Sequence, residues 1–113
     1  MSDKYILEGR KVVPADLMTW ARWYEAAKDE RIVAKTKLSH VEVSTVFLGL
    51  DHRPLAIDPH GPPQIFETMI FGGPQDGWTD RCATWDEAEE MHKRGVAVAE
   101  AAFSDTSEAV KDG

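Results

Sequence analysis

Hydrophobic residues concentrate in two stretches of the chain, residues 41–50 and 64–71. Both are rich in the β-branched and aromatic side chains that favour strands. Residues 31–38 alternate apolar and polar side chains, as a half-buried strand does. A tight turn at Ser39-His40 would pair residues 31–38 with residues 41–50 in antiparallel fashion.

The pattern predicts further strands on both sides of this region. Residues 78–83 follow a turn cluster at 72–77 and would return beside residues 64–71. Residues 5–13 predict a short strand or hairpin with Gly9 in the turn and Pro14 at its end.

Two other segments show helical spacing of apolar residues. The first helix starts after Asp16, a favourable N-cap. Its stripe comprises Leu17, Trp20, Ala21, Tyr24, Ala27 and Lys28, with Trp23 at the flank. The second helix opens with Thr84 and Glu87, which have the spacing of a capping box, and is predicted to end at about Phe103. Gly95 inside it predicts a close approach to the sheet. The stripe of this helix comprises Ala88, Met91, His92, Val96, Ala99 and Phe103.

The resulting order is β(β)-α-β-β-β-β-α, with short connections. No helix separates the strands within residues 31–83, so parallel crossovers are not expected there. We therefore predict an α+β fold, in which an antiparallel sheet of four to six strands carries two packed helices. A single domain would cover residues 1–103, and residues 104–113 would form a polar, disordered tail.

Strand pairing predicts which side chains share a face. With Lys37 opposite Glu42 and Leu50 opposite Ile65, one face is apolar enough to be the core. It collects Ile32, Ala34, Leu38, Val41, Val43, Thr45, Phe47, Phe66, Thr68 and Ile70. The opposite face collects Lys35, Lys37, Glu42, Ser44, Val46, Leu48, Leu50, Ile65, Glu67, Met69 and Phe71.

The second face has six apolar side chains around Glu67, and an apolar patch of this kind needs a cover. Three alternatives could cover this patch: other parts of the chain, a second copy of the chain in a homodimer, or a bound partner or ligand. A carboxylate among apolar side chains also needs a counter-charge, and Arg81 or Arg53 could supply it.

The negative charge of the chain indicates which kinds of partner it could bind. The 113 residues have a formal net charge of −7, and residues 76–113 carry 10 acidic but only 4 basic side chains. Phosphates would be repelled by this acidic third, so direct binding to nucleic acid is not expected. A basic protein partner is compatible with it.

Cys82 is the single cysteine, which excludes an intrachain disulfide and fits a reducing compartment. The sequence also has no apolar run of membrane-spanning length and no signal-peptide core after Met1. We therefore expect no membrane partner and a cytoplasmic location.

Metal binding is the main chemical alternative. Asp51 and His52 open a proline-rich loop that also contains Asp58 and His60, and His92 lies on the second helix. Two histidines and a carboxylate can hold zinc or a non-haem metal. However, the spacing matches no specific ligand motif, and the loop would have to fold back for His52 to approach Glu67. His92 also fits a partly buried, hydrogen-bonded residue of the helix stripe.

No other motif predicts a cofactor or a catalytic centre. Cys82 lacks a nucleophile context and fits a buried strand thiol. The turn at Gly72-Gly73-Pro74 does not precede a helix, so it is no phosphate loop. The tryptophans at positions 20, 23, 78 and 85 lack a basic groove and are predicted to pack between helix and sheet.

Four runs of the sequence show a resemblance to a known family: residues 14–23, 43–52, 66–73 and 84–88. Together they resemble small uncharacterised proteins encoded by tailed phages and prophages, over roughly residues 5–95. The loop at 53–63 is a variable region of that pattern. The resemblance implies a small intracellular protein made during infection or lysogeny, and it assigns no activity, cofactor or site residue.

The favoured hypothesis is therefore a non-enzymatic phage or prophage protein that engages a host or phage protein, one version being an inhibitor of a bacterial defence system. The predicted binding surface comprises Glu67, Leu48, Leu50, Met69, Glu87, Glu89 and Glu90. The alternative is a small metal- or ligand-dependent enzyme with Asp51, His52, Glu67 and His92 near one pocket, and the homodimer remains a third hypothesis.

Overall fold

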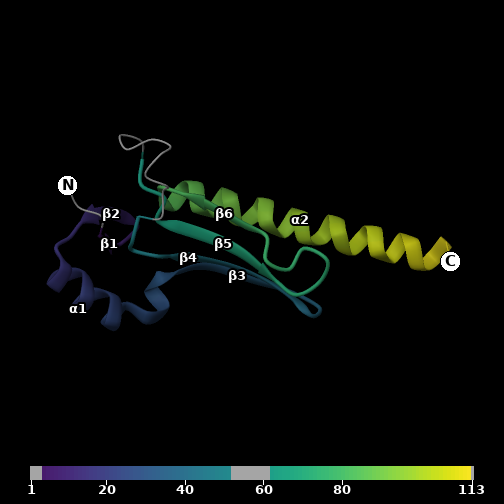
Figure 1. Ribbon diagram of the computed structural model, residues 1–113, viewed down its shortest axis with the longest axis horizontal. Coiled ribbons are helices and arrows are strands. Elements are labelled where there is room, and N and C mark those ends of the chain that lie inside the picture. Colours follow the sequence, from purple (N-terminus) through teal and green to yellow (C-terminus); the bar gives the residue numbers. More distant parts are fainter. Residues whose placement is uncertain (1–3, 52–61, 113) are drawn as a thin grey trace.

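A four-stranded antiparallel sheet forms the centre of the molecule (Figure 1). The computed structural model describes residues 4–51 and 62–112. The sheet has the order β3-β4-β5-β6, and its strands are β3 (Ile32–Leu38), β4 (Val41–Phe47), β5 (Phe66–Phe71) and β6 (Thr79–Cys82). The predicted α+β fold with an antiparallel sheet and two helices is confirmed.

The N-terminal elements gather at one end of this sheet. Strands β1 (Tyr5–Glu8) and β2 (Lys11–Pro14) form a separate two-stranded sheet, as the hairpin prediction around Gly9 anticipated. Helix α1 (Leu17–Ala27) follows, and the 3₁₀ turn η1 (Lys28–Arg31) leads into β3. The Asp16 carboxylate accepts a hydrogen bond from the Thr19 amide at 2.8 Å, so the predicted N-cap is confirmed.

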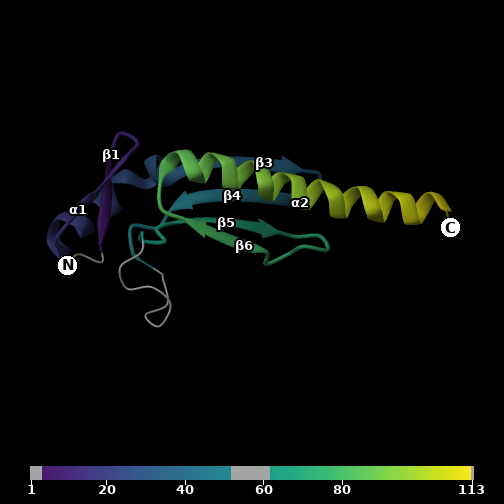
Figure 2. The same ribbon diagram turned by 90° about the horizontal axis from the view of Figure 1, so that it is seen from above.

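Helix α2 (Trp85–Asp112) lies along one face of the sheet, and its C-terminal part runs past the sheet end (Figures 1 and 2). The Thr84 hydroxyl accepts from the Glu87 amide, while Glu87 accepts from the Ala83 amide, so the capping box is formed. The predicted helix end at Phe103 was too early, because α2 continues to Asp112.

Gly95 allows α2 to approach the sheet closely. A methyl group at this position would lie 2.9 Å from Thr68 Cγ2 and 3.1 Å from Val43 Cγ1. The side of the sheet beneath α2 is therefore the core face, with Val43, Phe47, Phe66 and Ile70 almost fully buried.

Two details of the sheet differ from the sequence prediction. Strand β4 pairs with β5 through Phe47↔Phe66, two residues away from the register expected from Leu50 opposite Ile65. A two-residue shift preserves face membership, because side chains alternate with period two. Ile65 precedes β5 and is fully buried in the core, so its expected place on the opposite face was wrong.

A β-bulge in β3 causes the second difference. The pairing shifts between Ile32 and Ala34, so Ile32 lies opposite Val46 rather than on the core face. Val33 packs against the core cluster instead. In α1, Leu17 is exposed, whereas Trp23 makes an edge-to-face contact with Phe47. The stripe of α1 is thus rotated toward Trp23.

Candidate functional site

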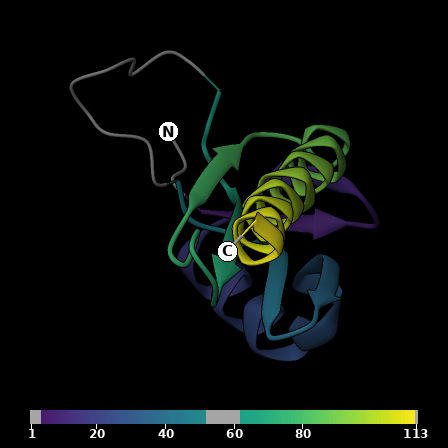
Figure 3. The ribbon, with the colours of Figure 1, turned by 90° about the vertical axis from the view of Figure 1, so that its right-hand side faces the viewer.

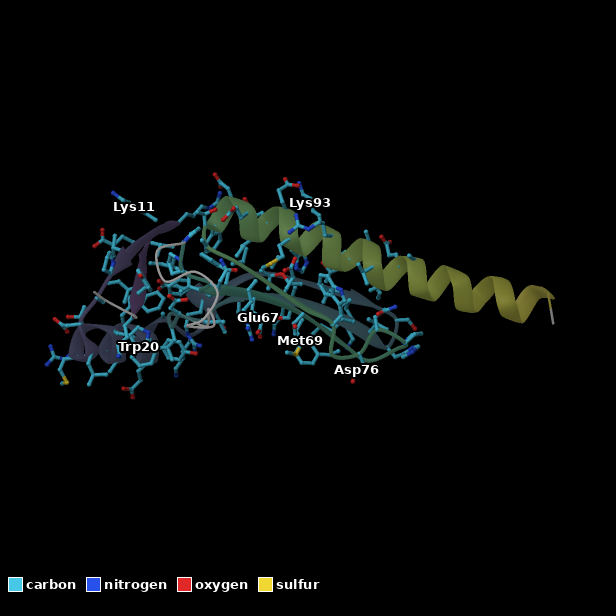
Figure 4. All side chains as sticks on the ribbon, turned by 45° about the horizontal axis from the view of Figure 1, so that its top comes forward. Lys11, Trp20, Glu67, Met69, Asp76 and Lys93 are labelled. Carbon is cyan, nitrogen blue, oxygen red and sulfur yellow. The ribbon has the colours of Figure 1, made fainter. Side chains whose placement is uncertain are left out.

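Helix α2 lies over one face of the sheet (Figure 3). The other face, here called the open face, carries the predicted residues Glu67 and Met69 (Figure 4). The register arranges this face in rows across the strands. One row reads Ile32, Val46, Glu67 and Arg81, the next reads Lys35, Ser44, Met69 and Thr79, and the third reads Lys37, Glu42 and Phe71.

Glu67 is neutralised within this face. Arg81 lies opposite it on β6, and the Arg81 Nε and Nη2 atoms are both 3.0 Å from Glu67 Oε2. Of the two arginines proposed as partners from the sequence, Arg81 fills the role, while Arg53 lies outside the described residues. Both contacts engage the same carboxylate oxygen, so Glu67 and Arg81 form a charge-assisted pair across the two strands.

A surface groove runs beside the edge strand β6, where the chain turns into α2. We call it the β6 groove. It has a volume of about 540 Å³. Strand β6 and the first turns of α2 contribute most of the lining, and Pro62 and Gln64 complete it. Its charged lining residues are Asp80, Arg81, Asp86, Glu87, Glu90 and Arg94.

The charges of the β6 groove are only partly paired. Arg94 lies 3.5 Å from Asp80, and Arg81 is bound to Glu67. Glu90 has a partner in Lys93, but both side chains are largely exposed, so this pair contributes little. Asp86 makes no ion pair within the described part of the chain. The groove therefore keeps an excess of negative charge.

The predicted binding surface is thus divided by the structure. Glu87 and Glu90 line the β6 groove, and Glu67 adjoins it through Arg81. Glu89 is exposed on α2 but does not line the groove. Leu48 and Leu50 lie beyond the end of β4 and are half-buried. The Leu48 amide donates a hydrogen bond to the Ile65 carbonyl. They do not form a patch with Met69 along a strand.

Asp86 and Arg94 in this groove were not predicted from the sequence. The sequence does contain a pattern that indicates their proximity. Asp86, Glu90 and Arg94 follow each other at intervals of four residues and therefore share one face of the helix. Asp80 alternates with Arg81 along β6 and therefore points toward α2.

His92 belongs to the core. It is 7% exposed, and its Nε2 lies 2.8 Å from Thr36 Oγ1 while its Nδ1 lies 2.7 Å from Thr45 Oγ1. Thr45 also bonds the Thr68 hydroxyl, and both threonines are fully buried. Burial lowers the pKa of His92, because it disfavours the imidazolium. Both ring nitrogens are used structurally, as the hydrogen-bonded interpretation of this residue predicted.

The pocket that would combine Glu67 with His92 is not formed, because the two side chains lie on opposite faces of the sheet. Asp51 bonds the Gln64 amide, and His52, Asp58 and His60 lie outside the described residues. Across residues 4–51 and 62–112, no three His, Cys, Asp or Glu side chains are grouped to bind a metal ion.

Cys82 is a buried thiol among the lining residues of the β6 groove. Burial, together with the nearby Glu87 and Asp80 carboxylates, raises its pKa to about 11. A thiol with such a pKa is a poor nucleophile at neutral pH, in agreement with the structural interpretation from the sequence.

Comparisons with known proteins give no further assignment: no protein-family model, no curated protein and no solved structure matches this chain. In the described part of the chain, no helix is both long enough and apolar enough to cross a membrane.

Proposed function

We propose that this chain is a small binding protein, without an enzymatic role, whose β6 groove holds a basic segment of a host or phage protein. The observation that carries the proposal is the groove itself, in which carboxylates from β6 and α2 outnumber arginines that are already paired. A segment bearing lysine or arginine would complement this charge.

Recognition would depend on side chains more than on strand pairing. The amide of Arg81 already donates to the Asp80 carboxylate at 2.9 Å, which limits addition of a partner strand at the β6 edge. Asp86 and Glu90 are exposed, and neither side chain caps the helix. They are therefore the side chains best placed to form ion pairs with lysine or arginine residues of a partner.

The biological setting rests on the resemblance of four sequence runs to phage and prophage proteins. In that setting the partner would be met in the cytoplasm of a bacterial host, and inhibition of a defence system is one role that fits an acidic protein blocking a basic surface.

The test is affinity capture from bacterial host lysate with three forms of the protein. Asp86→Lys/Glu90→Lys reverses the groove charge, whereas Glu89→Lys/Glu100→Lys makes the same charge change on exposed positions of α2 outside the groove. Glu87 is left intact because it caps the helix. We expect one protein to be enriched by the wild type and the control but not by the groove variant. Equal recovery by all three forms, or no reproducible recovery, would refute the proposal.

A further inference from the structure

A second hollow lies at the opposite edge of the sheet, where η1 enters β3. We call it the β3 hollow. It has a volume of about 340 Å³ and opens on the open face. Lys28, Arg31 and Lys35 supply three cations to its lining, while Asp29 is its single carboxylate. This excess of positive charge is notable in a chain with a net charge of −7.

Arg31 is held in a fixed position inside this hollow. Its guanidinium carbon lies 3.9 Å from the centre of the Tyr24 ring, a distance typical of cation–π stacking. The turn that brings Arg31 there includes Lys28 at φ 40°, a left-handed conformation that is rare for a side-chain-bearing residue. Lys28 is the C-cap of α1, and many helices end at a residue with positive φ.

One polar group that lines the hollow is buried and lacks a partner among the described residues. The Nε atom of Arg31 is buried and makes no hydrogen bond to any described residue. Ser44, which is 9% exposed, adds a hydroxyl group to the lining. A buried guanidinium N–H without an acceptor is costly, so such a group normally faces an anion or ordered water.

From these observations we infer that the β3 hollow binds a small ligand with an oxyanion, a carboxylate or a phosphate group, next to an apolar part. Arg31 and Ser44 would donate to the oxyanion, and Lys28 and Lys35 would add long-range attraction. The ring of Tyr24 and the side chains of Ile32 and Val46 would contact the apolar part. The volume is several times the roughly 30 Å³ of one water molecule, so a group of this size fits. This site does not depend on the β6 groove.

Benzoate and phenyl phosphate test the inference, because they share a ring and differ in the oxyanion. Each is titrated into ¹⁵N-labelled protein while the Arg31 Nε–H and Ser44 amide resonances are followed. We expect saturable shifts at millimolar concentration with at least one probe. Saturation by benzoate alone assigns a carboxylate, and saturation by phenyl phosphate alone assigns a phosphate.

Two variants and one control complete the experiment. Arg31→Gln should weaken binding about tenfold or more, since a hydrogen bond to a charged group is lost. Because Lys35 is exposed, we expect Lys35→Gln to keep the fold and to weaken binding about twofold to fivefold. Lys93→Gln, on the outer side of α2 (Figure 4), should bind as the wild type does. No saturable shift with either probe, or equal binding by the Lys35 and Lys93 variants, would overturn the inference.

Discussion

Replacing Gly95 by alanine sets two known effects against each other. In an isolated helix the change should stabilise by about 1 kcal/mol, because glycine is the poorer helix former. In this protein the new methyl group would lie 2.9 Å from Thr68 Cγ2, 3.1 Å from Val43 Cγ1 and 3.4 Å from Trp78. Overpacking of a core costs about 1–3 kcal/mol.

The steric cost should exceed the gain in helix propensity, because the side chain of Thr68, the nearest neighbour, cannot change its rotamer without loss. Thr68 is fully buried on β5, and its hydroxyl is bonded to Thr45. Rotating its methyl group away from Gly95 would break that bond. We therefore expect Gly95→Ala to lower the free energy of unfolding by about 1 kcal/mol, measured by urea denaturation with circular dichroism and tryptophan fluorescence.

Matched variants separate the two effects. Ala97→Gly, at an exposed position of the same helix, should lose about 1 kcal/mol through propensity alone. Thr68→Ser removes the obstructing methyl group and keeps the hydroxyl, so Gly95→Ala should become neutral or stabilising in the Thr68→Ser background. A stabilisation of about 1 kcal/mol by Gly95→Ala in the otherwise unchanged protein would refute the close packing of α2 on the sheet.

Three other expectations follow from single side chains. Thr84→Ala should lower the free energy of unfolding by about 1 kcal/mol in urea titrations, since the Glu87 amide loses its cap; an unchanged midpoint would contradict the cap. Because burial depresses the pKa of His92 below its ordinary value of 6.5, the unfolded chain binds the proton first. Stability should therefore be full above pH 6.5 and decline as the pH falls below it, with a slope of at most about 1.4 kcal/mol per pH unit, and His92→Gln should lose this part of the pH dependence. The Cys82 thiol, with its pKa raised from 9.0 to about 11, should react with an aromatic disulfide reagent at pH 8 about 100-fold more slowly in the folded than in the urea-unfolded protein, and equal rates would show that the thiol is accessible.

Local signals in the sequence were sufficient for most of the fold. The side chains of Asp16 and Thr84 placed the two helix starts, and the pairing of Lys37 with Glu42 followed from the tight turn between their strands. The register of β4 with β5 could not be derived, because the long connection between them does not constrain it. The β-bulge at Ile32 could not be derived either. Apolar and polar residues alternate on both sides of the extra residue, so the sequence pattern does not reveal it.

The candidate site was predicted only in fragments. Glu67 found the expected partner in Arg81, and Glu87 and Glu90 were recognised as part of an acidic helix start. Their convergence at one groove depends on how α2 lies over β6, which is a tertiary property. The β3 hollow was not predicted, because Arg31 and Tyr24 come together through a turn in which Lys28 has a positive φ. A lysine in the sequence does not indicate such a backbone conformation.

The most direct test of the proposed function is the dissociation constant of the captured partner for the same three proteins, measured by titration calorimetry at two salt concentrations. Reversing the charge of Asp86 and Glu90 should weaken binding about tenfold or more, and the salt dependence should diminish with it. The Glu89→Lys/Glu100→Lys control should stay within about threefold of the wild type. Equal weakening by the groove variant and the control would show that overall charge, and not the β6 groove, governs binding.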